Sequence, residues 1–226
     1  MKKMRENLIK YYNDVLLWNF IGGNRIENKN LIHTYVGLVD EESNETIDGL
    51  KKEDQIEVID GVIDSLVVGS YLYAVKRDVF EFSKASFDTV NMPLFDLIYK
   101  MEELKDHYRS YDGNLKDEFS DHIEEFMSYA EAIYVKLSEY VDVEGAFEEI
   151  LKSNWSKYPT IESVDADSEI MYIESQGRYS GVYSSISQSP KGDSFFVFKE
   201  GTKGKVVKPS VFKEPSLQKY ILKDFL

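Results

Sequence analysis

Apolar residues recur at steps of three and four along the first two thirds of the chain, a spacing that predicts mainly helices. The expected helices cover residues 4–18, 31–51, 55–75, 91–108, 115–140 and 142–152. The segment 55–75 is apolar on nearly all sides after Asp64, which is typical of a deeply buried helix. Because only a short link separates 31–51 from 55–75, these two helices are expected to pack antiparallel.

The pattern changes after Pro159, where Ser, Gly and Tyr become frequent. Short runs there predict strands. The expected elements are strands at 170–174, 179–186 and 194–199 and a short helix at about 216–223. The predicted fold is therefore mainly α, an antiparallel helix-bundle core with a small β-containing C-terminal extension. We expect a helical domain over 1–158, with a helical insertion at about 77–140, and a β-rich extension over 159–226.

Composition narrows the possible chemistry. The chain has no cysteine and three histidines. The absence of cysteine excludes disulfide scaffolds, thiolate zinc sites and cysteine nucleophiles. A metal site would therefore rely on carboxylates, which suit Mg²⁺, Mn²⁺ or Ca²⁺.

Charge and hydropathy indicate the partners and the compartment. The formal net charge is −14, with 41 acidic and 27 basic residues, which argues against a nucleic-acid-binding protein. The segment from Lys191 onward is net +4, so the first 190 residues carry −18. No signal-peptide pattern and no long uninterrupted apolar run are evident, so we expect a soluble cytoplasmic protein with no membrane partner.

Acidic residues concentrate on the two helices that the short link joins. On 31–51, Glu42 and Glu45 share a helix face, and Glu41 with Glu45 is the alternative pair. On 55–75 one stripe carries three acids, namely Glu57, Asp60 and Asp64. Burying carboxylates is costly unless cations neutralise them, so this pattern suggests a divalent metal site. The alternative is a solvated acidic face, which is common in a chain this rich in acids.

Four segments resemble a known family. Glu41-Glu42-Ser-Asn-Glu45, followed by Asp60-Gly-Val-Ile-Asp64 and an apolar run ending at Gly69, is similar to the signature of the all-α nucleoside triphosphate pyrophosphohydrolases. This is the MazG-like and phosphoribosyl-ATP pyrophosphohydrolase-like superfamily. The segments SNWSK (153–157) and KGKVVKP (203–209) resemble two further elements of its deoxynucleotide-hydrolysing branch, which is common in bacteriophages.

The resemblance implies an activity and a set of roles. It implies hydrolysis of a (deoxy)nucleoside triphosphate to monophosphate and pyrophosphate with Mg²⁺, or Mn²⁺, as cofactor. It implies a homodimer or homotetramer, in which the β-rich extension closes the site. Glu42, Glu45, Asp60 and Asp64 would hold the metal. Glu41 or Glu57 would orient or deprotonate the attacking water. The base and phosphates would be bound by Asn154, Lys157, Lys205 and Lys208.

The sequence departs from the family in the acidic pair, and the stretches 73–141 and 160–200 are longer than the family's. The usual acidic pair is ExxD, but Gly61 stands three residues before Asp64. Asp60 could substitute, or Glu57 with Asp60 could form the pair one turn earlier, and both alternatives stay open. Other functions also stay open: a related hydrolase acting on phosphoribosyl-ATP, or a catalytically silent viral factor that binds nucleotides or proteins.

The predicted ligand-binding residues have simpler interpretations too. Asn154 could cap the end of a helix and Lys157 could be a solvated surface lysine. Lys205 and Lys208 could belong to an edge strand, where charge discourages aggregation. Trp18 could stack on a base, although core packing is the commoner role of a tryptophan.

Overall fold

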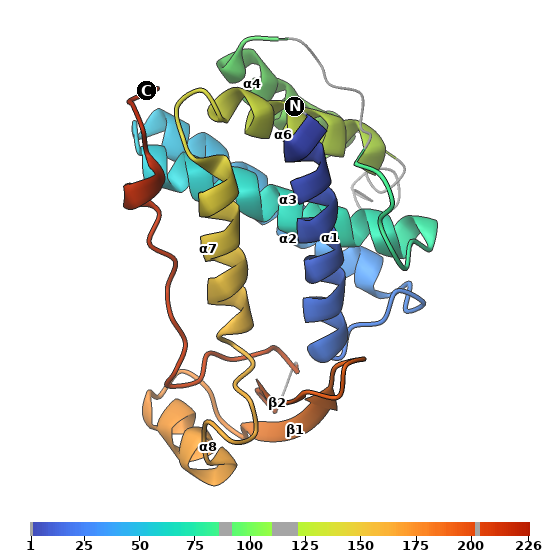
Figure 1. Cartoon of the computed structure of the whole chain (residues 1–226), viewed down its shortest axis with the longest axis vertical. Coiled ribbons are helices and arrows are strands. Elements are labelled where there is room, and N and C mark those ends of the chain that lie inside the picture. The colour runs from blue at the N-terminus through green and yellow to red at the C-terminus, as the bar shows by residue number, and fades with distance from the viewer. Residues whose placement is uncertain (1, 86–91, 110–121, 202–203) are drawn as a thin grey trace. The chain divides into compact units, whose positions relative to one another are not determined.

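The computed structural model describes residues 2–85, 92–109, 122–201 and 204–226, and within them the fold is mainly helical with one small antiparallel sheet (Figure 1). This agrees with the predicted mainly α class with a small β-containing part. The helices are α1 (Lys2–Ile21), α2 (Leu31–Lys51), α3 (Gln55–Arg77), α4 (Leu94–Arg109), α6 (Ile123–Leu137), α7 (Val143–Trp155) and α8 (Ala166–Ser175). The strands are β1 (Tyr183–Gln188) and β2 (Ser194–Lys199), and a 3₁₀ turn, η1, spans Gln218–Tyr220.

The chain divides into two compact units. The helical unit comprises Met1–Leu16, Ile26–Ile150 and Ser216–Leu226. The β unit comprises Leu17–Arg25 and Leu151–Pro215. Each unit draws on separate stretches of the chain, whereas the sequence predicts a boundary after residue 158.

Helix α3 is the central element of the helical unit. It packs against α2 and α6, and α4 packs against α6 and α2 (Figure 1). By length and composition alone α3 could cross a membrane, but 83% of its most apolar stretch is buried inside the protein. A buried core helix can have the same length and apolar composition as a membrane-spanning helix. Burial on nearly every side explains the apolar composition that the sequence analysis noted.

The turn between α2 and α3 is tightly built. Glu53 adopts a left-handed conformation with φ of 56°. Asp54 then caps α3, because its side chain accepts hydrogen bonds from the backbone N–H groups of Ile56 and Glu57 at 3.0 and 3.2 Å. This turn reverses the chain within a few residues and lets α2 and α3 pack side by side.

The expected insertion supplies two core helices, α4 and α6. The buried carboxylate of Glu131 on α6 accepts a hydrogen bond from the Tyr12 hydroxyl at 2.9 Å. The Asn13 side chain brackets the backbone of Phe82, donating to its carbonyl at 2.9 Å and accepting from its N–H at 2.8 Å. The expected start of a helix at Asn91 and the expected helical residues 115–121 lie outside the described residues.

The β unit is built around β2. Strand β1 pairs with it in antiparallel register, from Tyr183 opposite Lys199 to Gln188 opposite Ser194. Successive β2 side chains enter separate apolar clusters. Val197 packs with Ile21 and Tyr158, and Phe198 packs with Ile173, Val182 and Val207.

One predicted strand is wrong. Residues 170–174 belong to helix α8. Asp165 caps this helix by accepting from the backbone N–H of Ser168 at 2.9 Å. Acidic residues at Asp167 and Glu169 favour the first turn further. These helix-starting signals outweigh the strand propensity of the short apolar run.

The predicted C-terminal helix is also wrong, since only the turn η1 forms there. The chain beyond η1 pairs in extended conformation with the segment before α7. Val141 and Ile221 form an antiparallel bridge, and the N–H of Leu222 donates to the carbonyl of Tyr140 at 2.8 Å. This long-range pairing replaces local helical hydrogen bonds.

Candidate functional site

The six predicted carboxylates come from two packed helices. Glu41, Glu42 and Glu45 lie on α2, and Glu57, Asp60 and Asp64 lie on α3. We refer to these six residues as the acidic face. Glu41 and Glu45 are exposed, whereas Glu42 and the three α3 acids are half-buried.

Glu42 is the electrostatic centre of the acidic face. Burial raises the pKa of its carboxyl most, followed by the negative charges of Asp64, Glu45, Glu41 and Asp60. Together these effects raise the pKa of Glu42 to about 9. At neutral pH without a cation, the Glu42 carboxyl therefore holds a proton. The acids of α2 and α3 thus act on one another across the helix pair.

The outer part of the acidic face forms around Glu45. Burial raises the pKa of its carboxyl, and the charges of Glu41 and Glu57 raise it further. The charges of Asp60 and Asp64 thus raise the pKa of Glu42, and the charge of Glu57 raises the pKa of Glu45.

The departure at Gly61 has a steric reason. A Cβ built at Gly61 would lie 2.5 Å from Oγ1 and 2.8 Å from the backbone N of Thr46 on α2. A second close approach lies one turn earlier in α3, at Glu57. A Cβ built at Gly49 of α2 would lie 2.8 Å from the Cβ of Glu57. No larger side chain fits at residue 61 at this helix separation. A glutamate at this position would need the two helices to move apart.

The acidic face is not a preformed metal cage. Among the described residues, no group of three or more His, Asp or Glu side chains is placed to hold a metal ion. The donor chemistry nevertheless suits a hard divalent cation, because the groups are carboxylates and their mutual repulsion would be relieved by positive charge. Mg²⁺ commonly binds one or two carboxylates and completes its shell with water and substrate phosphates.

The other predicted residues belong to the β unit. Asn154, near the end of α7, accepts a hydrogen bond from the Lys157 ammonium through its side-chain oxygen at 2.7 Å. Its backbone carbonyl accepts from the Trp18 indole at 2.8 Å. The Trp18 ring stacks on Tyr158 with 5.3 Å between centroids, so Trp18 packs in a core cluster. The Lys157 ammonium lies 5.5 Å from the Trp18 ring centre.

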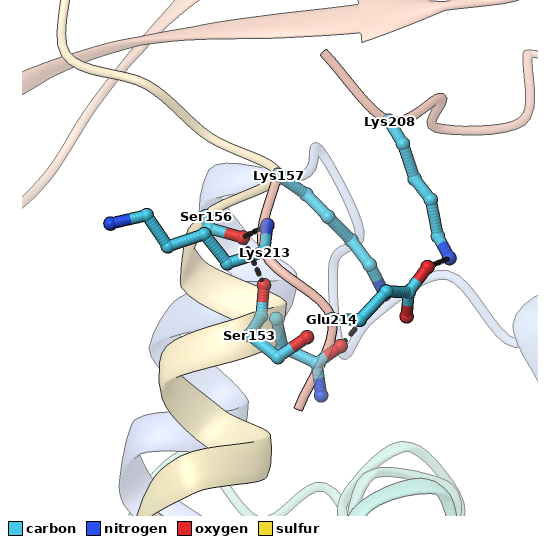
Figure 2. A network of polar contacts seen from close by, with 7 residues as sticks. Ser153, Ser156, Lys157, Lys208, Lys213 and Glu214 are labelled. Atoms are coloured by element: carbon cyan, nitrogen blue, oxygen red, sulfur yellow. Dashed lines mark hydrogen bonds and ion pairs between the residues drawn. The ribbon is translucent and has the colours of Figure 1, made fainter. Parts of the chain in front are cut away.

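Two predicted lysines approach the same aromatic ring. The ammonium groups of Lys157 and Lys208 lie 5.9 and 4.2 Å from the ring centre of Phe212. Lys208 also forms an ion pair with Glu214 at 2.7 Å, and Figure 2 shows the two lysines reaching in from different segments. Lys205 is exposed. We call Asn154, Lys157, Lys208, Phe212 and Glu214 the lysine cluster.

Two serines, Ser153 and Ser156, connect the end of α7 to the segment around Lys213. The Ser156 hydroxyl donates to the carbonyl of Ser153 at 2.6 Å and accepts from the backbone N–H of Lys213 at 2.9 Å (Figure 2). These bonds hold the Phe212 segment beside Lys157. Residues of both predicted motifs, Ser153, Ser156 and Lys157 of the first and Lys208 of the second, therefore lie in one local structure.

Sequence reasoning missed Glu214 as a member of this cluster. It lies six residues from Lys208, with a proline between itself and the 3₁₀ turn η1, and no periodic pattern marks it. The close approach of Gly61 to Thr46 was also missed. Its only signal in the sequence was the glycine at the expected acidic position.

Comparisons with protein-family models, with curated proteins and with solved structures find no match for this chain.

Proposed function

We propose that this protein is a Mg²⁺-dependent nucleoside triphosphate pyrophosphohydrolase. The observation that carries the proposal is the mutual electrostatic influence of all six acids on α2 and α3, centred on Glu42. Repulsion of this kind is costly in a purely structural site and is typical of a site that receives cationic charge. The order of the four sequence motifs, similar to MazG-like enzymes, supports the same function.

Glu42, Glu45, Asp60 and Asp64 would hold the cation. It would supply Lewis-acid charge to the phosphate oxygens and lower the pKa of a bound water. Asp60 and Asp64 are favoured as the inner donors because their charges act directly on the half-buried Glu42. Glu42 would lose its proton when positive charge arrives.

The attacking water would be oriented and deprotonated by one of the more solvent-accessible acids of the acidic face. Glu41 is exposed and Glu57 is half-buried, so both are open to solvent, and either carboxylate would orient the water and accept its proton. The water oxygen forms a bond to the α-phosphorus. The bond from that phosphorus to the bridging oxygen breaks, and pyrophosphate leaves.

The lysine cluster would bind the substrate. Two ammonium groups beside one aromatic ring provide charge for phosphates and an apolar surface for a base. Glu214 neutralises Lys208 in the absence of substrate. A phosphate would compete with this carboxylate for Lys208. Lys205 would add further positive charge from the exposed tail.

The test is pyrophosphate release from each of the eight common nucleoside and deoxynucleoside triphosphates, with Mg²⁺ and with EDTA. We expect Mg²⁺-dependent release from one or a few substrates, together with an equal amount of monophosphate. Release of inorganic phosphate instead would contradict the proposed bond cleavage. Binding of nucleotides without any release, in folded protein, would favour the silent binding factor. A parallel reaction with phosphoribosyl-ATP distinguishes the proposed enzyme from a related hydrolase that acts on that substrate.

A further inference from the structure

The outer edge of β1 is open within the described part of the chain. Strand β2 is bordered on both sides, by β1 and by the segments around Thr160 and Val206. Strand β1 has β2 as its only strand neighbour among the described residues. Ile186, in the middle of β1, is 64% exposed.

The register shows which backbone groups face this edge. The N–H of Phe196 donates to the carbonyl of Pro159, and the carbonyl of Phe198 accepts from the N–H of Val207. The backbone groups of these even-numbered β2 residues therefore face away from β1. The odd-numbered residues therefore bond to β1, through Tyr183, Ser185 and Ser187. The backbone groups of the outer edge belong to Ser184, Ile186 and Gln188.

This edge lacks the usual protection against pairing. Natural edge strands carry lysine, proline or bulges that block a second strand. The sequence of β1 is Tyr-Ser-Ser-Ile-Ser-Gln, which contains no charge, proline or glycine, although the whole chain carries a net charge of −14. Within the described residues only its start is covered, where the Glu174 carboxylate accepts a hydrogen bond from the N–H of Val182 at 2.9 Å.

We propose that β1 pairs with β1 of a second copy of this chain, antiparallel and centred on Ile186. In this register Ile186 faces Ile186 of the other copy, and Ser184 faces Gln188 of the other copy. All three residues with outward backbone groups then form hydrogen-bonded pairs. The two hairpins join into one four-stranded sheet.

Charge favours this partner. The same register places Lys191, exposed in the β1–β2 turn, opposite the Gly181–Val182 end of the other strand. Glu174 holds its carboxylate at that end. The two-fold symmetry repeats the pair, so two lysine–glutamate contacts flank the strands. The turn's own acid, Asp193, is engaged with the Ser189 hydroxyl at 3.2 Å.

Cysteine crosslinking tests the register directly, because the chain has no native cysteine. In a hydrogen-bonded antiparallel pair the facing Cα atoms lie about 5.5 Å apart, within the range of a disulfide. We expect full-length Ile186→Cys protein to form a disulfide-linked dimer on mild oxidation. The matched control is Gln188→Cys, whose two cysteines would lie roughly 15 Å apart and should not crosslink.

Two further variants address the hydrogen bonds and the charges. Ile186→Pro removes an outward N–H and leaves the β1–β2 hydrogen bonds intact, so it should abolish the dimer in light scattering while circular dichroism stays unchanged. Lys191→Glu should weaken dimerisation by roughly three- to tenfold. A monomer at all concentrations, or equal crosslinking of Ile186→Cys and Gln188→Cys, would overturn the proposal. Neither result would bear on the proposed hydrolase activity.

Discussion

At the scale of single residues, Glu42 has the most informative environment. Its carboxyl combines partial burial with four neighbouring acids, and these raise its pKa to about 9. An unfolded chain would return it to about 4.5. Between these two pH values the folded protein holds a proton that the unfolded protein lacks, so the free energy of unfolding falls as pH rises.

The first prediction concerns Glu42→Gln, measured in EDTA by urea unfolding at pH 6 and pH 8. The amide cannot ionise, so the variant should lose this pH dependence. At pH 8 its free energy of unfolding should exceed that of wild type by about 1–2 kcal/mol, after allowance for partial solvent screening. The exposed Glu139→Gln is the control. If the free energy of unfolding of Glu42→Gln fell between pH 6 and pH 8 as steeply as that of wild type, the raised pKa of Glu42 would be refuted.

The ion pair between Lys208 and Glu214 gives a second prediction at this scale. Glu214→Gln leaves the Lys208 charge available to a phosphate, so KM for the triphosphate should fall by about threefold. Lys208→Gln should raise KM by about tenfold, with kcat changed much less. Steady-state kinetics on the best substrate measures both. Equal KM values in the two variants would exclude Lys208 from phosphate binding.

At the scale of elements, the packing of α2 on α3 determines the acidic face. Helical spacing predicted α2 with its observed bounds, Leu31–Lys51, and predicted that α3 is buried. It did not reveal how closely the helices approach, because that distance depends on glycines meeting the opposite backbone.

The third prediction tests this close approach. Gly61→Ala places a Cβ against Thr46, so it should destabilise the protein by about 1–3 kcal/mol despite the higher helix propensity of alanine. Gly37→Ala on α2 is the matched control. Apart from its chain neighbours and its own helix backbone, no described atom lies within 4 Å of the added Cβ, so this variant should be neutral or stabilising by up to about 1 kcal/mol. Thermal unfolding compares the two, and equal effects would show that residue 61 is not in tight contact.

The predictions that failed depended on distant partners or on capping. The strand expected at 170–174 became helix α8 because Asp165 caps it. The helix expected at 216–223 was replaced by pairing of Ile221 with Val141, a residue far away in sequence. Local propensity cannot anticipate such pairing. Glu214 was not linked to Lys208 because the six-residue spacing between them follows no helix or strand period.

At the scale of the whole molecule, the predicted site residues divide between two compact units. The acidic face belongs to the helical unit and the lysine cluster to the β unit. The segment from Lys191 onward is net positive within a chain of net charge −14, and it extends from the β unit into Ser216–Leu226 of the helical unit.

The fourth prediction concerns Mg²⁺ and stability. A cation bound at ten times its Kd adds about 1.4 kcal/mol to the free energy of unfolding. For a chain of this size, Mg²⁺ at that concentration should therefore raise Tm by roughly 3–5 °C. The comparison uses NaCl of equal ionic strength, which screens charge without specific binding. An equal rise with NaCl would show that only general screening acts.

The most direct test of the central claim is the rate of pyrophosphate release by Asp64→Asn beside Glu139→Gln, with Mg²⁺ and the best triphosphate. The Asp64→Asn substitution keeps the shape of the side chain and removes one inner carboxylate. We predict a loss of at least about 100-fold in kcat for Asp64→Asn, in protein with wild-type circular dichroism. Glu139→Gln should keep the wild-type rate. Full activity in Asp64→Asn would contradict the assignment of the acidic face as the metal and reaction site.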